Sequence, residues 1–252
     1  MKDLHLSYAF FCNSGAEANE AAIKLARKHT GKHKIIVFEK SFHGRTFGAM
    51  SATGQDKVRK GFGPLVSEFI TLPFNDVEAL KAAVDDETAA IMLEMIQGEG
   101  GVNSVTDEFA EAIRNIQETT DILVIVDEVQ TGIGRTGTRF AFEQTVLKPN
   151  IVSMAKGLGG GFPIGGILGT EELFDTFNAG THGTTFGGNP LAVAVAQTVI
   201  DQVFDDAFLQ NVQQKSAYFI KKLKENFKEP DFTVQGKGFM RLQKQVFWKA
   251  IL

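Results

Sequence analysis

The feature that most constrains the fold is an alternation of short apolar runs with longer segments of helical periodicity. Apolar runs predict strands at Ile35–Glu39, Glu68–Leu72, Ala89–Glu94, Ile122–Asp127, Ile151–Met154 and Ile164–Gly169. Apolar residues at helical spacing predict helices at Ala16–His29, Asp76–Val84, Asp107–Thr119, Leu191–Phe204 (opened by Pro190) and Leu209–Phe227. Strands that alternate with helices indicate an α/β fold, in which a mostly parallel sheet carries helices on both faces.

Length and charge bound the remaining possibilities. With 252 residues, 43% of them hydrophobic, the chain can bury one large core and part of another. The sheet pattern stops near Asp205-Asp206, so we expect a large domain over residues 1–205 and an incomplete small α+β domain over 206–252. A net charge of −4 with scattered Lys and Arg argues against nucleic-acid binding.

The same composition argues against a membrane or secreted protein. No uncharged apolar stretch reaches the roughly 18 residues that a membrane helix needs, and the start of the chain lacks a signal-peptide pattern. Cys12 is the single cysteine, which excludes an internal disulfide and is typical of a small buried hydrophobe. We expect a cytoplasmic protein.

Lys156 follows the strand pattern Ile151–Met154 after one alanine and precedes the glycine-rich run Gly157–Gly161. Earlier in the chain, an apolar strand pattern ends in Asp127, which places a carboxylate at the carboxyl edge of a parallel sheet, where open α/β folds bind ligands. Pyridoxal phosphate requires such a pair, because an amine forms a Schiff base with it and a carboxylate keeps its pyridine nitrogen protonated. We therefore predict that Lys156 and Asp127 share one pyridoxal phosphate site.

Two further motifs suit this cofactor, and each also has a plainer interpretation. Ser14 can cap a helix with Glu17 in a capping box, so that the amides of Gly15 and Ala16 face a phosphate. An ordinary capped helix would show the same residues.

In the segment Ser41–Thr46, Phe42 can cover a planar ring and Arg45 can bind a carboxylate with two parallel hydrogen bonds. A core Phe and a surface Arg in a turn would fit equally well. With no second His at metal spacing, we expect His43 to be structural and predict no metal site.

A nucleotide hydrolase is the alternative suggested by the apolar strand that ends in Asp127-Glu128. It would need the phosphate-binding pattern Gly-x-x-x-x-Gly-Lys-Ser/Thr, which the sequence lacks. Glu94 and Glu99 are expected to be a strand-end and a loop carboxylate, although surface solvation explains Glu99 as well. The glycine-rich loop around Thr184 and Thr185 offers two hydroxyls to a phosphate, or is a simple turn.

Taken in order, these motifs resemble the class III aminotransferases, which are fold type I enzymes that use pyridoxal phosphate. The resemblance rests on Ser14–Asn19, Phe42–Arg45, Asp127–Gly132, Ala155–Gly157 and Gly183–Pro190, and it runs from about Phe11 to Phe227. It implies that an amino group moves from an amino acid to a 2-oxo acid, with N-acetylornithine as the expected donor and 2-oxoglutarate as the acceptor. Ornithine, 4-aminobutyrate and succinyldiaminopimelate are alternative donors within the family.

The resemblance also implies a role for each matching residue. The catalytic residues would be Lys156 and Asp127. The cofactor would be bound by Ser14, Gly15, Ala16, Phe42, Asp127, Glu128, Val129, Gln130, Lys156 and Thr185. The substrate would be bound by Arg45, Thr184 and Glu99. Thr184 and Thr185 would act across a homodimer interface, so that each site needs two chains.

The chain departs from the family at both ends. Family members carry a segment before the Ser14 motif, whereas this sequence begins close to it. After Gly236–Met240 the sequence no longer follows the family pattern, so the small domain is expected to be incomplete. An inactive remnant that survives only as a folding or dimerisation module is therefore the alternative to an active enzyme.

Overall fold

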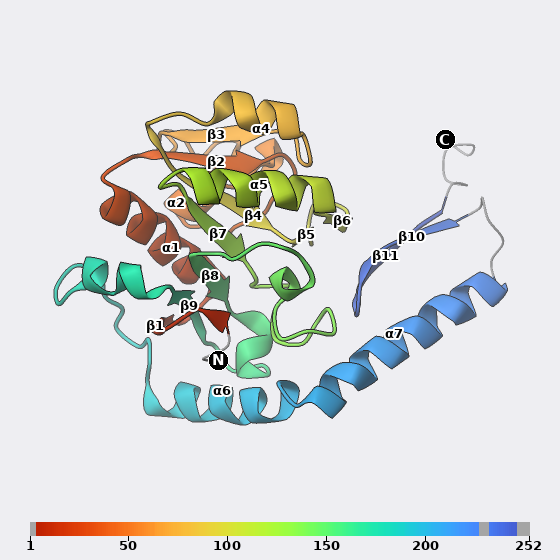
Figure 1. Ribbon diagram of the computed structural model, residues 1–252. Coiled ribbons are helices and arrows are strands. Elements are labelled where there is room, and N and C mark those ends of the chain that lie inside the picture. Colours follow the sequence, from red (N-terminus) through yellow and green to blue (C-terminus); the bar gives the residue numbers. More distant parts are fainter. Residues whose placement is uncertain (1–3, 227–231, 246–252) are drawn as a thin grey trace.

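The computed structural model describes residues 4–226 and 232–245 (Figure 1). Its centre is a seven-stranded sheet in the order β1-β9-β8-β7-β4-β2-β3. The strands are β1 (Tyr8–Cys12), β2 (Lys34–Phe38), β3 (Phe69–Leu72), β4 (Thr88–Glu94), β7 (Leu123–Asp127), β8 (Ile151–Met154) and β9 (Gly165–Gly169). Because β3, β2, β4, β7 and β8 pair in parallel, the predicted α/β fold with a mostly parallel sheet is confirmed.

The strands are buried on both faces, which explains their nearly continuous apolar sequences. Every residue of β4 and β7 is buried. In β4, Ile91 and Leu93 belong to one core cluster, whereas Ala90 and Met92 belong to the other. This alternation follows from the period of two along a strand, and it gives the sheet two separate apolar faces.

Helices cover both faces, as predicted. The main helices are α1 (Gly15–Thr30), α4 (Val77–Ala83), α5 (Asp107–Thr119), α6 (Pro190–Val203) and α7 (Asp206–Asn226). Helix α1 packs its alanine-rich side into one cluster, whereas α4, α5 and α6 contribute to the other. Short elements lie between these segments: α2 (Phe47–Ser51), α3 (Asp56–Arg59), η2 (Ala141–Gln144), η3 (Lys156–Gly159), η4 (Glu171–Phe177), β5 (Ile96–Gln97) and β6 (Asn103–Ser104).

One edge of the sheet differs from the expectation. The sequence predicted no strand at Tyr8–Cys12, yet β1 pairs antiparallel with β9, and β9 pairs antiparallel with β8. The run before Ser14 is short and follows no helix, so local periodicity could not reveal its pairing with a strand more than 150 residues away. The parallel part of the sheet is therefore closed at this edge by an antiparallel pair.

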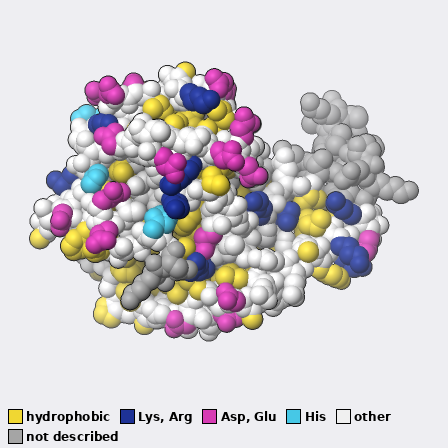
Figure 2. Space-filling view, viewed as in Figure 1, with side chains coloured by type: hydrophobic (Ala, Val, Ile, Leu, Met, Phe, Trp, Pro, Cys, Tyr) yellow, Lys and Arg dark blue, Asp and Glu magenta, His cyan; other side chains and the backbone are white. Residues whose placement is uncertain are grey.

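Beyond α6, the chain forms an arm that consists of α7 and the antiparallel hairpin of β10 (Phe232–Lys237) and β11 (Met240–Gln245). Figure 2 shows the arm as a lobe beside the main body. The hairpin turn is held by hydrogen bonds from Phe239 N to Arg135 O (2.9 Å) and from Ser216 Oγ to Gly238 O (2.9 Å). The end of the predicted helix at Phe227 and the tail after Gln245 lie outside the described residues. The domain division at residue 205 stays a prediction.

Among the described residues, no helix has both the length and the apolar character needed to cross a membrane. Likewise, no group of His, Cys, Asp or Glu in this part of the chain is arranged to hold a metal ion.

Candidate active site

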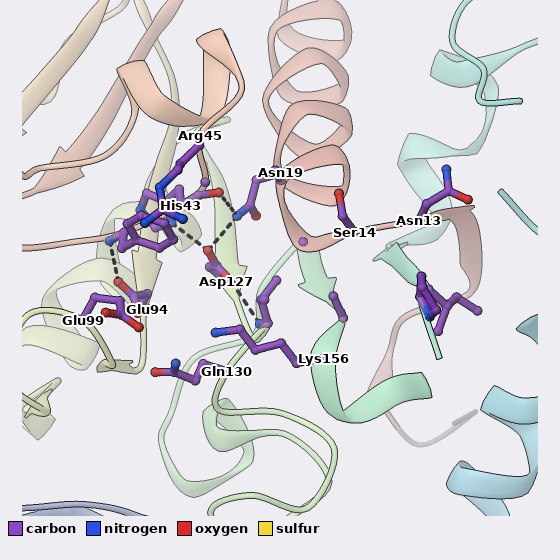
Figure 3. Close-up of a pocket in the computed structure, with 18 of the residues that line it drawn as sticks. Asn13, Ser14, Asn19, His43, Arg45, Glu94, Glu99, Asp127, Gln130 and Lys156 are labelled. Carbon is purple, nitrogen blue, oxygen red and sulfur yellow. Dashed lines mark hydrogen bonds and ion pairs between the residues drawn. The ribbon is translucent and has the colours of Figure 1, made fainter. Parts of the chain in front are cut away.

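The carboxyl ends of four neighbouring parallel strands meet at one edge of the sheet and carry the candidate site. Strand pairing puts Glu94 at the end of β4 beside Asp127 at the end of β7, and Asp127 beside Ser153 of β8. The chain leaving these strand ends lines a cavity of about 500 Å³, within the usual range for a small-molecule site. It contains Lys156 and Asp127 together, as the sequence predicted (Figure 3).

Lys156 stands at the point where β8 ends and η3 begins. Its backbone φ of 41° lies in the left-handed region, which is rare for a residue with a side chain. Strained backbone of this kind persists where the surrounding structure enforces it and is concentrated at functional sites. Figure 3 shows the side chain reaching into the cavity, into the space between Asp127 and Gln130.

Asp127 is held by three hydrogen bonds. Its Oδ2 accepts one from Asn19 Nδ2 and one from His43 Nδ1, both at 2.8 Å, and its Oδ1 accepts one from Val129 N at 3.0 Å. Asn19 is itself fixed, because its Nδ2 also donates to His43 O at 2.7 Å and its Oδ1 accepts from Ser153 Oγ at 2.6 Å. These side chains are almost fully buried, so the carboxylate has one fixed orientation.

His43 contacts the Asp127 carboxylate, which the sequence did not predict. Burial lowers the pKa of its imidazole, but the hydrogen bond and the negative charge of Asp127 outweigh burial, so the pKa is raised. Its second nitrogen, Nε2, is buried and has no hydrogen-bond partner among the described residues. His43 thus contributes one of the two side-chain hydrogen bonds that hold the Asp127 carboxylate.

The first turn of α1 borders the cavity with backbone amides. Ser14 caps the helix as predicted, since its Oγ accepts from Glu17 N at 3.2 Å. The Glu17 carboxylate accepts from Asn13 N at 2.9 Å, one residue earlier than in the predicted capping box. A side chain on Gly15 would put its Cβ 2.7 Å from Cγ1 of Val129, so only glycine fits between the helix and this residue.

Phe42 and Arg45 both line the cavity, and the Arg45 guanidinium lies 5.3 Å from the centroid of the Phe42 ring. The backbone N–H of Phe42 donates to Glu94 Oε1 at 2.9 Å, and Gly98 N donates to Glu94 Oε2 at 3.0 Å. Burial raises the pKa of Glu94 to about 7. Glu94 thus ties the Phe42 loop to the loop that carries Glu99, which also lines the cavity.

Ser14, Gly15, Ala16, Val129 and Gln130 are also among the lining residues. The side-chain amide of Gln130 lies against Gly98. A Cβ at position 98 would be 1.4 Å from Gln130 Oε1, so a side chain at position 98 would displace this amide.

Three residues expected at the site are not among those that line the cavity: Glu128, Thr184 and Thr185. The Glu128 carboxylate is fully buried and accepts hydrogen bonds from Thr131 Oγ1 and from Phe142 N (2.9 Å), which anchors the following loop instead. The Thr184 hydroxyl accepts from Asn13 Nδ2 at 3.0 Å.

Sequence reasoning missed Asn19 and did not predict the contact between His43 and Asp127. Asn19 belongs to the quoted motif Ser14–Asn19, but the motif alone does not indicate that its side chain reaches the end of β7. A signal was present in the polarity of Asn19, which occupies the same side of α1 as the buried Ala18, Ala22 and Ala26.

Comparisons with known proteins identify the family. The family described as Aminotransferase class-III matches residues 2–242. The chain belongs to the class III aminotransferase family. The acetylornithine aminotransferase of Halalkalibacterium halodurans is 61% identical over 216 residues, which make up 86% of this chain and 56% of that protein. The acetylornithine aminotransferase of Bacillus cereus is 53% identical over 93% of this chain and 61% of its own length.

Among solved structures, the ornithine aminotransferase of Toxoplasma gondii, described with partial occupancy of pyridoxal phosphate at its active site, matches with a TM-score of 0.88 at 33% identity. That match covers 94% of this chain and 59% of the other. The N-acetylornithine aminotransferase of Stenotrophomonas maltophilia matches with a TM-score of 0.74 at 36% identity over 92% of this chain and 58% of the other. The chain thus spans less than two thirds of the length of these relatives.

Proposed function

We propose that this chain is the cofactor-binding part of an aminotransferase that moves an amino group from N-acetyl-L-ornithine to 2-oxoglutarate with pyridoxal phosphate. The proposal depends on one observation: Lys156, on strained backbone, and Asp127 line the same cavity. The buried side chains of Asn19 and His43 hold the Asp127 carboxylate in place. Identity of 61% and 53% to two acetylornithine aminotransferases supports N-acetylornithine as the donor.

The residues present suit the cofactor. The first turn of the 16-residue helix α1 offers unpaired backbone N–H groups to a phosphate, and Gly15 leaves the approach open. Phe42 and Val129 line the same cavity and would cover the two faces of a flat ring. When bound, pyridoxal phosphate supplies a protonated pyridine ring that stabilises negative charge on the substrate carbon that bears the amine.

The chain's own residues would divide the remaining work. Lys156 would attach the cofactor through its Nζ and then, as general base and acid, move a proton at the substrate carbon. Asp127 would hold the proton on the ring nitrogen, and Asn19 and His43 would keep its carboxylate in place. Gln130 would reach the phenolic oxygen of the ring, and Arg45 and Glu99 would contact the substrate.

We further propose that the protein acts as a cytoplasmic homodimer in which Thr185 and Thr184 serve the partner's site. Their absence from the lining of their own cavity supports this arrangement. So does the apolar surface next to them, since Phe186 is 71% and Leu191 62% exposed.

A mixing experiment tests the dimer. Thr185→Val and Lys156→Ala proteins, each inactive alone, should regain activity when mixed, because the hybrid dimer contains one site with both residues. No recovery in a mixture shown by ultracentrifugation to contain hybrid dimers would contradict the shared site.

The decisive test of the function begins with an absorbance scan of the purified protein. A covalently bound cofactor gives a visible absorption band, which borohydride should abolish while fixing the cofactor to Lys156 in peptide mapping. Lys156→Ala should lose both signals and all transamination. An adduct on a different lysine would overturn the assignment, and absence of any visible band after addition of pyridoxal phosphate would support the inactive remnant.

The donor is tested separately. N-acetylornithine, ornithine, 4-aminobutyrate and succinyldiaminopimelate should be compared at equal concentration with 2-oxoglutarate as acceptor. The proposal requires the largest kcat/KM for N-acetylornithine. A larger value for any of the other three donors would move the protein to that activity within the same family.

A further inference from the structure

Helix α1 presents one of its sides to the loop between β2 and α2. Residues three and four positions apart lie on the same side of a helix, so Ala16, Asn19 and Glu20 point in similar directions. Asn19 Nδ2 donates to His43 O at 2.7 Å (Figure 3). At Gly44 the backbone φ is 137°, and an added Cβ would lie 2.9 Å from the Cβ of Ala16. The loop therefore passes directly against the helix.

Glu20 holds the segment that follows Arg45. Its Oε1 accepts hydrogen bonds from Thr46 Oγ1 at 2.5 Å, from Gly48 N at 2.8 Å and from Ala49 N at 3.0 Å. Both backbone N–H groups belong to the first turn of α2, where a helix leaves its own donors without partners. The side chain of the N-cap residue Thr46 makes no capping bond. The Glu20 carboxylate, which comes from another helix, thus takes the place of the cap.

The Arg45 side chain depends on this backbone for its direction. It is exposed, and its guanidinium lies 5.3 Å from the centroid of the Phe42 ring. Before Arg45 the backbone is held at His43, whose N–H donates to Thr53 Oγ1 at 2.9 Å. After Arg45 the backbone is held by Glu20. In the described part of the chain no ion pair joins Glu20 to Arg45, so the carboxylate acts through the backbone and leaves the guanidinium to a ligand.

We propose that Glu20 is a positioning residue for substrate binding: by capping α2, it fixes the backbone from which Arg45 reaches the substrate carboxylate. The inference rests on the proposed function, which assigns Arg45 to the substrate. It makes α1 the common support of the site, because the first turn of α1 faces the cofactor phosphate, Asn19 holds Asp127 and Glu20 holds the Arg45 loop. Since the contact is made to backbone N–H groups, an uncharged acceptor of the same length should replace the carboxylate.

Steady-state kinetics test this role. Glu20→Ala should raise the KM of the amino donor about tenfold, because a small misplacement of a binding group is enough for such a loss. The kcat and the visible band of the bound cofactor should stay close to those of the unaltered protein. Glu20→Gln should restore most of the donor affinity, since its amide oxygen can accept from the same N–H groups. Glu111→Ala, which removes an exposed carboxylate from α5, should change none of these quantities.

Two kinetic results would overturn the role. One is an unchanged KM in Glu20→Ala. The other is a loss of cofactor occupancy as large as the loss of donor affinity, because that would make Glu20 a support of the whole site rather than of the Arg45 loop.

A second measurement does not depend on activity. Trypsin cleaves after an arginine only where the backbone can open, so the rate of cleavage between Arg45 and Thr46 reports how firmly this segment is held. Mass spectrometry should locate cleavage at this bond that is several-fold faster in Glu20→Ala than in the unaltered protein and nearly normal in Glu20→Gln. Cleavage after Arg135, which is exposed in the loop after β7, is the internal reference and should not change.

The two measurements separate this inference from the proposed function. If Glu20→Ala is cleaved no faster after Arg45 and keeps its KM, the role of Glu20 is wrong and the proposed function stands. If the unaltered protein binds neither cofactor nor amino donor, the proposed function fails. Faster cleavage of Glu20→Ala would in that case still show that Glu20 holds the backbone beside Arg45.

Discussion

Replacing Asn19 with alanine tests whether the buried network under Asp127 is as important as its geometry suggests. Asn19 is 1% exposed, and its amide connects His43 O, Asp127 Oδ2 and Ser153 Oγ. Asp127 Oδ2 would keep the hydrogen bond from His43, but the His43 carbonyl and the Ser153 hydroxyl would each lose their one observed partner. A buried polar group left unpaired costs about 1–3 kcal/mol, so two such groups should lower the free energy of unfolding by about 3 kcal/mol.

Urea unfolding, followed by fluorescence with and without pyridoxal phosphate, measures this loss. Asn115→Ala is the matched control, because Asn115 is exposed on α5 and should change stability by less than about 0.5 kcal/mol. The Asn19 variant should also bind the cofactor more weakly, since Asp127 would no longer have one fixed orientation. Equal stability of the two variants, or full cofactor affinity in Asn19→Ala, would refute the reasoning from the network.

Three further outcomes are expected. Gly15→Ala should weaken cofactor binding, measured by titration of the visible band, because the new Cβ would displace Val129. Arg45→Lys should raise the KM of the amino donor by an amount equivalent to about 1.5–3 kcal/mol with cofactor occupancy unchanged, since the planar fork is lost; equal loss of both would place Arg45 in the scaffold. Burial raises the pKa of Glu128 from 4.5 to about 7, so the folded state binds this proton more tightly. Protonated Glu128 therefore stabilises the folded state fully below pH 4.5. This stabilisation, about 3 kcal/mol, is lost as the pH rises to 7. Relative to the native protein, Glu128→Gln should therefore become more stable by that amount between pH 4.5 and pH 7, as measured by urea unfolding. The same dependence of unfolding free energy on pH in both proteins would contradict the raised pKa of Glu128.

Much of this arrangement could be predicted from the sequence because the signals are local. Each buried strand of a parallel sheet is a short apolar run, and each crossover helix shows its own period, so the order of elements along the chain is readable. Lys156 and Asp127 lie at the ends of two such runs. Since neighbouring parallel strands present their carboxyl ends at one edge, their shared location follows from the strand assignment alone. The N-cap at Ser14 is equally local, and the structure confirms it.

What the sequence could not determine depends on contacts between distant segments. The hydrogen bond from Asn19 to Asp127 joins residues 108 positions apart, and β1 pairs with β9, which lies more than 150 residues later in the chain. Glu128 adjoins Asp127 in sequence, but its carboxylate accepts a hydrogen bond from Phe142 N in a later segment and is buried there, away from the cavity. The hairpin turn likewise contacts Arg135 through the hydrogen bond from Phe239 N, although the two residues lie far apart in the sequence. The sequence thus determined which residues end the strands, and the folded structure decided which neighbours orient them.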